Sequence, residues 1–282
     1  MKAARIDRLE TINVDLPNIC PHKLAMHTMQ GQTLVVLRLH CSDGIAGNAE
    51  PTTTGGLAYG NESPESIKIN LDSYCAPLLI GQAAENINAA MLRLAKAKEN
   101  NTFARSAVET ALLDAQGKRL GLPVSELLSG RVRNALEVAW ILASGDTAKD
   151  IQEAEHMLEE RRHRTLKLEI GANALEQDLA HGVAIKKAVG DRASARVDVN
   201  QYRGESQAIK GCQLLCENGI DLIEQPVSRG NRGAQGRLNQ RSPAPIMADE
   251  SIESVEHLYA AAVFPLHGYR GDWALPSSFL GP

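Results

Sequence analysis

Three acidic residues in the second half of the chain each close a short apolar run. Asp198 ends the run ARVD, Glu224 ends DLIE and Asp249 ends PIMAD, with separations of 26 and 25 residues. This spacing matches one strand plus one helix, so we expect the three carboxylates at corresponding ends of successive strands. Carboxylates that meet repel one another, and a hard divalent cation such as Mg²⁺ or Mn²⁺ relieves that repulsion. We favour a metal site over the alternative of helix caps or solvated loop acids, because all three residues fall in register.

A lysine and a glutamate two residues apart lie on an earlier apolar run. In the run TLKLE, Lys167 and Glu169 share one face, because side chains alternate along a strand. If that face points toward a divalent cation, the like charge would lower the pKa of Lys167 and suit it to act as a general base. The alternative is a surface Lys–Glu pair, which these two residues taken alone would favour.

The elements that must position these residues alternate between strand and helix from about residue 136. Such alternation predicts βαβ units and a parallel sheet, in the α/β class. In a (β/α) barrel the carboxyl ends of the strands meet at one rim, where catalysis occurs. The expected strands are residues 138–142, 165–170, 195–199, 220–224 and 245–249, and the expected helices are 147–162, 175–189 and 205–218.

The first part of the chain has a different, α+β pattern. Strands are expected over residues 6–16 and 32–41, followed by helices over 66–79, 86–98 and 104–120. Between strands and helices, Thr52–Gly56 is a loop of small residues, which is either a flexible lid or a simple turn.

Composition excludes several classes of protein. The chain has 282 residues, a net charge of −4 and 43% hydrophobic residues, which is typical of a globular protein. It has no basic stripe for nucleic acid, no apolar run long enough for a membrane span and no signal peptide. Five cysteines with irregular spacing do not form a disulfide framework, so a cytoplasmic location is expected.

The last 26 residues differ from the rest. Residues 257–282 hold five of the ten aromatic residues and three prolines. A (β/α)₈ barrel needs about 250 residues, whereas 147 residues run from Leu136 to the end. We therefore interpret 257–282 as an atypical tail that follows a frame shift or premature end near residue 256. Unpaired strand edges would then lower the solubility of the chain.

Several motifs together resemble one family. The strand ends VDVNQ, IEQP and ADES resemble the metal-binding strand ends of the enolase superfamily. The segments PHKLAMH and GGLAYG resemble muconate cycloisomerases, in the mandelate racemase/muconate-lactonizing group of that superfamily. The resemblance runs from about residue 6 to residue 256.

The resemblance implies an α+β capping domain over residues 1–130 and a partial (β/α) barrel over 131–256. It implies Mn²⁺ or Mg²⁺, a small dicarboxylate substrate and a homo-oligomer if the barrel folds. The reaction links cis,cis-muconate and muconolactone through a metal-stabilised enolate. The motifs also imply roles for individual residues. Asp198, Glu224 and Asp249 would bind the metal, Lys167 and Glu169 would be catalytic, and Asn200 and Glu250 would support these groups. Residues 22–29 and the loop containing Thr54 and Tyr59 would enclose the substrate.

The sequence departs from the family pattern at two places. The second Lys of the family's Lys-x-Lys motif is the proton-abstracting base, and Glu169 stands at that position. The Lys and the acidic proton donor that later strands supply in the family have no counterpart before the tail. Two other readings therefore remain: an inactive fragment or pseudoenzyme that at most binds metal, and another reaction of the superfamily such as dipeptide epimerisation or succinylbenzoate synthesis.

Overall fold

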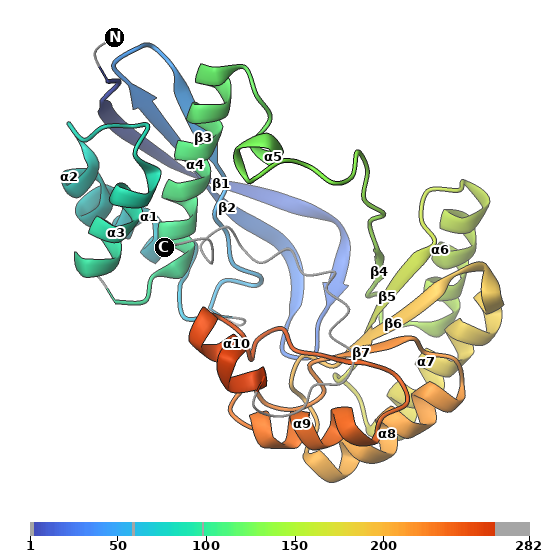
Figure 1. Cartoon of the computed structure of the whole chain (residues 1–282). Helices are drawn as coiled ribbons and strands as arrows, with labels where there is room; N and C mark the ends of the chain where they lie inside the picture. Colours follow the sequence, from blue (N-terminus) through green and yellow to red (C-terminus); the bar gives the residue numbers. More distant parts are fainter. Residues whose placement is uncertain (1–2, 58–59, 98, 263–282) are drawn as a thin grey trace. The chain divides into compact units, whose positions relative to one another are not determined.

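The computed structural model describes residues 3–57, 60–97 and 99–262, so Tyr59 and most of the expected tail lie outside the described residues (Figure 1). The chain divides into two compact units. Among the described residues, the first contains residues 3–18 and 31–134, and the second contains residues 19–30 and 135–262. None of the helices in the described ranges combines the length and the apolar character that crossing a bilayer requires.

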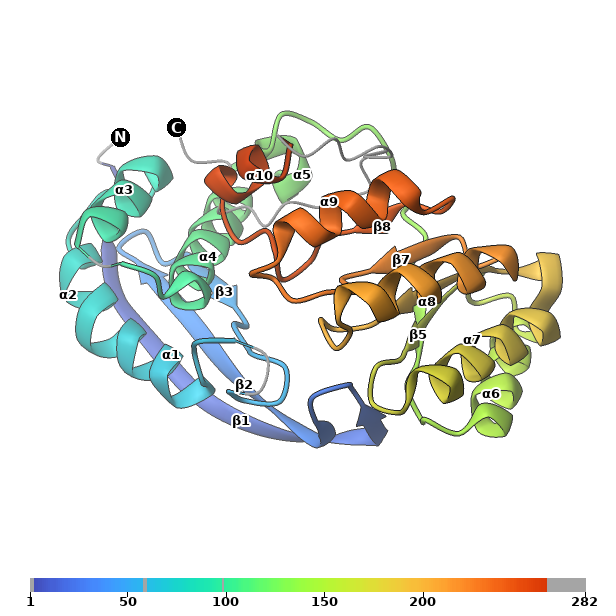
Figure 2. The same ribbon diagram turned by 90° about the horizontal axis from the view of Figure 1, so that it is seen from below.

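The first unit is a three-stranded sheet with helices packed on one face (Figure 2). The sheet order is β1-β2-β3, and β2 and β3 are antiparallel. Buried residues of the strands and of the helices form one apolar core. The elements are β1 (Ile6–Lys23), β2 (Thr28–Cys41), β3 (Ala46–Ala49), α1 (Pro64–Asn70), a π-helical turn (Leu71–Cys75), α2 (Ala76–Leu79), α3 (Ile87–Ala97), α4 (Thr102–Leu120) and α5 (Val124–Leu127).

Close packing of β3 on α4 holds this unit together. A Cβ atom at Gly47 would lie 1.8 Å from the carbonyl oxygen of Ala111, so only glycine permits this approach. The Glu62 carboxylate accepts a hydrogen bond of 2.9 Å from the amide of Phe103 at the start of α4. The helix ends at Gly121, whose φ is +65°. The helix expected over 104–120 is thus confirmed.

The second unit is a parallel sheet of five strands in the sequential order β4-β5-β6-β7-β8. Helices α6 to α9 pack along one face, as Figure 2 shows. Sequential parallel strands joined by helices form part of a (β/α) barrel, which confirms the expected fold class. The elements are β4 (Trp140–Leu142), α6 (Thr147–Glu159), β5 (Thr165–Glu169), α7 (Leu175–Val189), a 3₁₀ turn (Gly190–Arg192), β6 (Ser194–Asp198), α8 (Glu205–Glu217), β7 (Leu222–Glu224), α9 (Arg232–Arg241), β8 (Ile246–Met247) and α10 (Val255–Ala262).

Two features of the second unit differ from the sequence-based expectation. The last described strand, β8, ends at Met247, so Asp249 lies in the loop beyond it and is not a strand end. Helix α9 was not expected, because its sequence RGAQGRLNQR has only Ala234 and Leu238 as apolar residues. Both are buried, and their spacing of four residues places them on one side of the helix.

Candidate active site

The carboxylates meet at the carboxyl edge of the five-stranded sheet. Glu169 on β5 is paired in register with Asp198 on β6, and Asp198 with Glu224 on β7. Each of the three is the last residue of its strand, and a buried apolar residue directly precedes it. The parallel register thus places three acidic side chains in one row, as the sequence spacing predicts for Asp198 and Glu224.

Lys167 lies among these carboxylates. Its Nζ is 2.8 Å from Asp198 Oδ2, 3.0 Å from Glu224 Oε2 and 4.0 Å from Glu169 Oε1. This geometry confirms that Lys167 and Glu169 face the same way, and it excludes the exposed surface pair. Burial acts to lower the pKa of Lys167, but Asp198, Glu224 and Glu169 outweigh it and raise that pKa. The expected lowering supposes a divalent cation beside Lys167 and stays a prediction, because the charges next to Lys167 in this structure are all negative.

The cluster carries more negative charge than Lys167 balances. Burial, followed by repulsion from Asp198, raises the pKa of both Glu169 and Glu224. Burial also raises the pKa of Glu250 to about 7. Glu169 Oε2 and both carboxylate oxygens of Glu250 are buried without a hydrogen-bond partner. Buried oxygens in this condition are strongly destabilising unless a cation or proton joins them.

Residues beyond the strands complete the cluster. Asp249, in the loop after β8, contributes to raising the pKa of Glu224 and of Glu169. Asn200 donates a backbone hydrogen bond of 2.8 Å to Asp198 Oδ1. Its φ is +45°, a left-handed conformation that asparagine adopts more readily than most residues other than glycine. Asn200 thus contacts Asp198 through its main chain, and its side-chain oxygen is buried without a partner.

The donor chemistry fits a hard divalent cation. Three carboxylates lie around the Lys167 ammonium group, the charges of Asp249 and Glu250 act on them, and oxygen atoms are the ligands that Mg²⁺ and Mn²⁺ prefer. In the described residues no three His, Cys, Asp or Glu side chains are arranged to hold one metal ion together. Instead, the Lys167 ammonium group lies between the carboxylates of Asp198 and Glu224 and forms a salt bridge with each.

The expected substrate loops are placed only in part. Residues 19–30 belong to the same unit as the carboxylates, and the main-chain amide of Lys23 donates to the Ala143 carbonyl over 2.8 Å. Burial and the charge of Lys167 lower the pKa of His22, so His22 lies within electrostatic reach of Lys167. Thr54 is in a turn of the first unit, and Tyr59 is outside the described residues.

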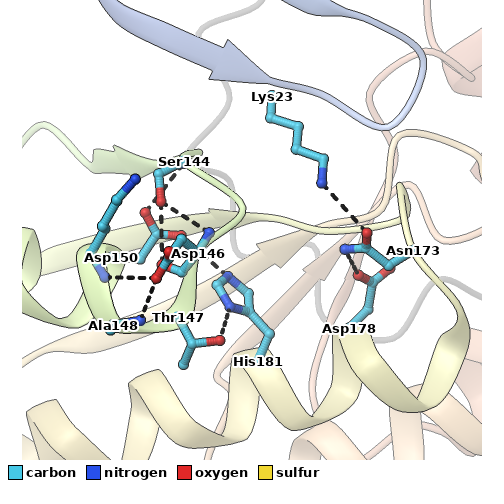
Figure 3. Close-up of polar contacts among 10 residues, drawn as sticks. Lys23, Ser144, Asp146, Thr147, Ala148, Asp150, Asn173, Asp178 and His181 are labelled. Carbon is cyan, nitrogen blue, oxygen red and sulfur yellow. Dashed lines mark hydrogen bonds and ion pairs between the residues drawn. The ribbon is translucent and has the colours of Figure 1, made fainter.

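A second polar region borders the cluster (Figure 3). It surrounds a pocket of about 220 Å³ that Lys23, Glu169, Asn173 and His181 help to line. Lys23 Nζ donates to Asn173 Oδ1 over 3.4 Å. His181 lies between two groups, with Nδ1 at 2.8 Å from Thr147 Oγ1 and Nε2 at 3.3 Å from the buried carboxylate of Asp150.

Each buried aspartate of this second region faces a side chain that can carry a positive charge. Asp150 also accepts from the Ser144 amide over 3.2 Å. Burial acts to raise the pKa of Asp150, but hydrogen bonds from His181 and Ser144 lower it below its ordinary value. Asp178 accepts from the Gly171 amide and pairs with Arg203. These carboxylates stabilise the loops and helices around them.

Sequence reasoning gave no role to the amide side chains at the rim. Gln201 acts to lower the pKa of Glu250, and its side-chain oxygen accepts from the Arg229 amide over 3.0 Å. Gln225 and Gln235 are buried beside the loop that carries Asp249. Gln201 and Gln225 had a signal in the sequence, because they stand in the motifs VDVNQ and IEQP, whereas Gln235 had none.

Two family models match the chain. Residues 8–129 match the mandelate racemase/muconate lactonizing enzyme N-terminal domain, and residues 149–262 match the enolase C-terminal domain-like family. The first match lies in the α+β part of the chain, and the second covers the strands that carry the carboxylates.

Individual relatives agree with these matches. Muconate cycloisomerase 1 of Pseudomonas putida is 69% identical over 264 residues, covering 93% of this chain and 70% of the relative. A chloromuconate cycloisomerase of Pseudomonas sp. strain P51 is 40% identical, covering 92% and 70%. The crystal structure of muconate lactonizing enzyme from Pseudomonas fluorescens complexed with muconolactone has a TM-score of 0.91 at 67% identity, covering 93% and 70%. The chain therefore belongs to the muconate cycloisomerase family, within the mandelate racemase/muconate lactonizing group of the enolase superfamily.

Proposed function

We propose that the chain acts as a muconate cycloisomerase, interconverting cis,cis-muconate and muconolactone during catechol breakdown. The observation that carries the proposal is the 69% identity to the Pseudomonas putida enzyme over nearly the whole chain. The row of Glu169, Asp198 and Glu224 around Lys167 supports it, because acidic groups at the carboxyl edge of a (β/α) sheet are where such enzymes work. The substrate is a small dicarboxylate.

Asp198, Glu224 and Asp249 would hold Mn²⁺ or Mg²⁺. A bound divalent cation stabilises the negative charge that develops on the substrate carboxylate when the adjacent carbon loses its proton. The orphaned oxygens of Glu169 and Glu250 and the raised pKa of Glu224 support this assignment, since each reports unbalanced negative charge. Asn200, through its main-chain contact with Asp198, and Glu250 would keep the ligands in place.

Glu169 is the group that would hold and move the proton. It occupies the position of the family's base, and its raised pKa favours the protonated form more than in an ordinary glutamate. During lactone formation it would give a proton to the carbon next to the carboxylate, and during lactone opening its carboxylate would accept that proton. Lys167, kept as an ammonium by its raised pKa, would stabilise nearby negative charge. The loop around Thr54 and Tyr59 would enclose the substrate, and homo-oligomerisation stays a prediction.

Turnover of cis,cis-muconate with added Mn²⁺ tests the proposal. The loss of the diene's ultraviolet absorbance measures the rate. Glu169→Gln should lower the rate by about 10²-fold or more, the range for loss of a general acid–base group. Glu176→Gln, a carboxylate-to-amide change on the exposed surface of α7, is the matched control. Exchange of the muconolactone proton in D₂O, read by NMR, measures the proton step by itself. Equal rates for the two variants would contradict the role of Glu169.

A second candidate function is metal binding without turnover. Glu169 in place of the family's lysine favours it, because a carboxylate repels an anionic substrate. In that case the chain binds Mn²⁺ but neither consumes muconate nor exchanges the lactone proton. Glu169→Lys would then produce turnover that the natural sequence lacks.

A further inference from the structure

Gln225 connects the two acidic strand regions β7 and β8. It follows Glu224 directly, is fully buried and has a φ of +35°. Its main-chain amide donates to the Met247 carbonyl over 2.9 Å, and its carbonyl accepts from the Gln201 amide over 2.8 Å. This left-handed conformation is unfavourable for a glutamine, so its side-chain contacts must compensate for it.

The side chain of Gln225 fixes the loop that carries Asp249. Its Oε1 accepts from the Asp249 amide over 2.9 Å and from the Ser251 amide over 3.2 Å. Its Nε2 donates to the Val227 carbonyl over 2.8 Å and to Ser251 Oγ over 2.7 Å. Only this amide orientation suits the site, because two N–H groups face the oxygen and a carbonyl faces the nitrogen.

Gln235 extends the network to helix α9. Its Oε1 accepts from Ser251 Oγ over 2.9 Å, and its Nε2 donates to the Met247 carbonyl over 3.3 Å. Both glutamines are buried, so the network is held away from water. Since β8 ends at Met247, the strand ladder does not support Asp249, and the amide side chain of Gln225 replaces that support.

We infer that Gln225 is a positioning residue that holds Asp249 next to Glu224, and so sets the affinity of the site for a divalent cation. The consequence for the cation rests on the proposed function. The positioning itself rests on the hydrogen bonds alone. Residues that orient ligands in this way typically change metal affinity by 10–100-fold when they are replaced.

The test compares Gln225→Met with Asn239→Leu. Methionine keeps the length and removes every hydrogen bond of the amide. Asn239 is the matched control, because this buried amide accepts from the Ile246 amide over 3.3 Å at the opposite end of the same strand β8. Both changes should destabilise the fold. Only Gln225→Met should raise the Mn²⁺ dissociation constant, by about 10–100-fold, read from the electron paramagnetic resonance of free Mn²⁺. Gln225→Glu, which keeps an oxygen toward Asp249 and Ser251, should recover part of the affinity.

Amide hydrogen exchange separates this inference from the proposed function. Gln225→Met should speed exchange at Asp249 and Ser251 by about tenfold, the value for losing one hydrogen bond, and Asn239→Leu should not. Unchanged exchange at these two amides in Gln225→Met overturns the inference, whatever the metal data show. If exchange rises but the natural chain binds no Mn²⁺, or Asp249→Asn binds it equally well, the metal assignment fails and the positioning role stands. If Asp249→Asn loses Mn²⁺ but Gln225→Met keeps it, Gln225 does not set the affinity.

Discussion

Two groups of buried carboxylates lie side by side in the second unit and differ in how their charge is balanced. Asp150 faces His181, Asp178 pairs with Arg203, and the pKa of Asp150 is lowered, although Asp150 Oδ2 also lacks a hydrogen-bond partner (Figure 3). Around Lys167 three carboxylates share one ammonium group, the charges of Asp249 and Glu250 act on the same cluster, and the pKa of Glu250 is raised to about 7. A buried carboxylate with its own basic partner contributes to the fold. A group of buried carboxylates that share one basic partner is typical of a functional site.

The largest expected effect is the loss of the ammonium group in the cluster around Lys167. Lys167→Met should lower the free energy of unfolding by about 3–5 kcal/mol, because the buried carboxylates of Asp198 and Glu224 lose the ammonium group that pairs with both of them. Urea unfolding at pH 7 with a chelator present measures the effect, and added Mn²⁺ should reverse part of it. Equal stability of the variant and the natural chain would show that the cluster is balanced by other groups.

Replacing a carboxylate that has its own basic partner should also destabilise the fold, without touching the cation site. Asp150→Asn should lower the free energy of unfolding by about 1.5–3 kcal/mol, the range for a hydrogen bond to a charged group. Its Mn²⁺ dissociation constant should stay within about twofold of the natural value. A parallel loss of Mn²⁺ affinity would mean that the two groups of carboxylates act as one site.

The two groups should respond to pH with opposite sign. The folded-state pKa of Glu250 is raised from 4.5 to about 7, so the folded protein holds this proton more tightly, and stability falls as pH rises between these values. The slope for one proton is about 1.4 kcal/mol per pH unit at most. The folded-state pKa of Asp150 is lowered, so its contribution is present above the ordinary value and is lost as pH falls through the folded value. Urea unfolding from pH 4 to 8 with a chelator should show the first trend, and Glu250→Gln should make it shallower without removing it, because the pKa values of Glu169 and Glu224 are also raised.

The smallest expected effect is a gain in stability. Glu169→Gln removes one buried charge from the cluster and offers N–H donors to its neighbours. Without Mn²⁺ it should raise the free energy of unfolding by about 1 kcal/mol, even though it removes the proposed proton-transfer group. Thermal unfolding of the variant beside Glu176→Gln measures this. A destabilised Glu169→Gln would show that its carboxylate is already balanced in the folded chain.

The sequence predicted the parts of this molecule that depend on regular spacing. The repeat of apolar runs gave the parallel sheet, and the register then brought Glu169, Asp198 and Glu224 into one row. It did not predict that the loop after β8 carries Asp249 or that α9 forms, because both depend on amides and small apolar residues brought together by the tertiary fold.

Electrostatics and non-local partners were harder to predict. The sequence places Lys167 beside Glu169 but does not show that Asp198 and Glu224 also contact its ammonium group, and these carboxylates raise its pKa in the absence of a cation. Gln225 and Gln235 lie ten residues apart in the chain and meet through Ser251. No local pattern relates these three residues, so their network emerges only from the folded structure.

A Mn²⁺ titration of the natural chain, Asp198→Asn and Asp150→Asn tests the central claim most directly. Both variants change one buried aspartate of the second unit to asparagine, one in the cluster around Lys167 and one outside it. The account predicts one saturable site in the natural chain and in Asp150→Asn, and loss of that site in Asp198→Asn. Equal binding by Asp198→Asn and the natural chain would contradict it, and the excess of carboxylates around Lys167 would then have no role in holding a cation.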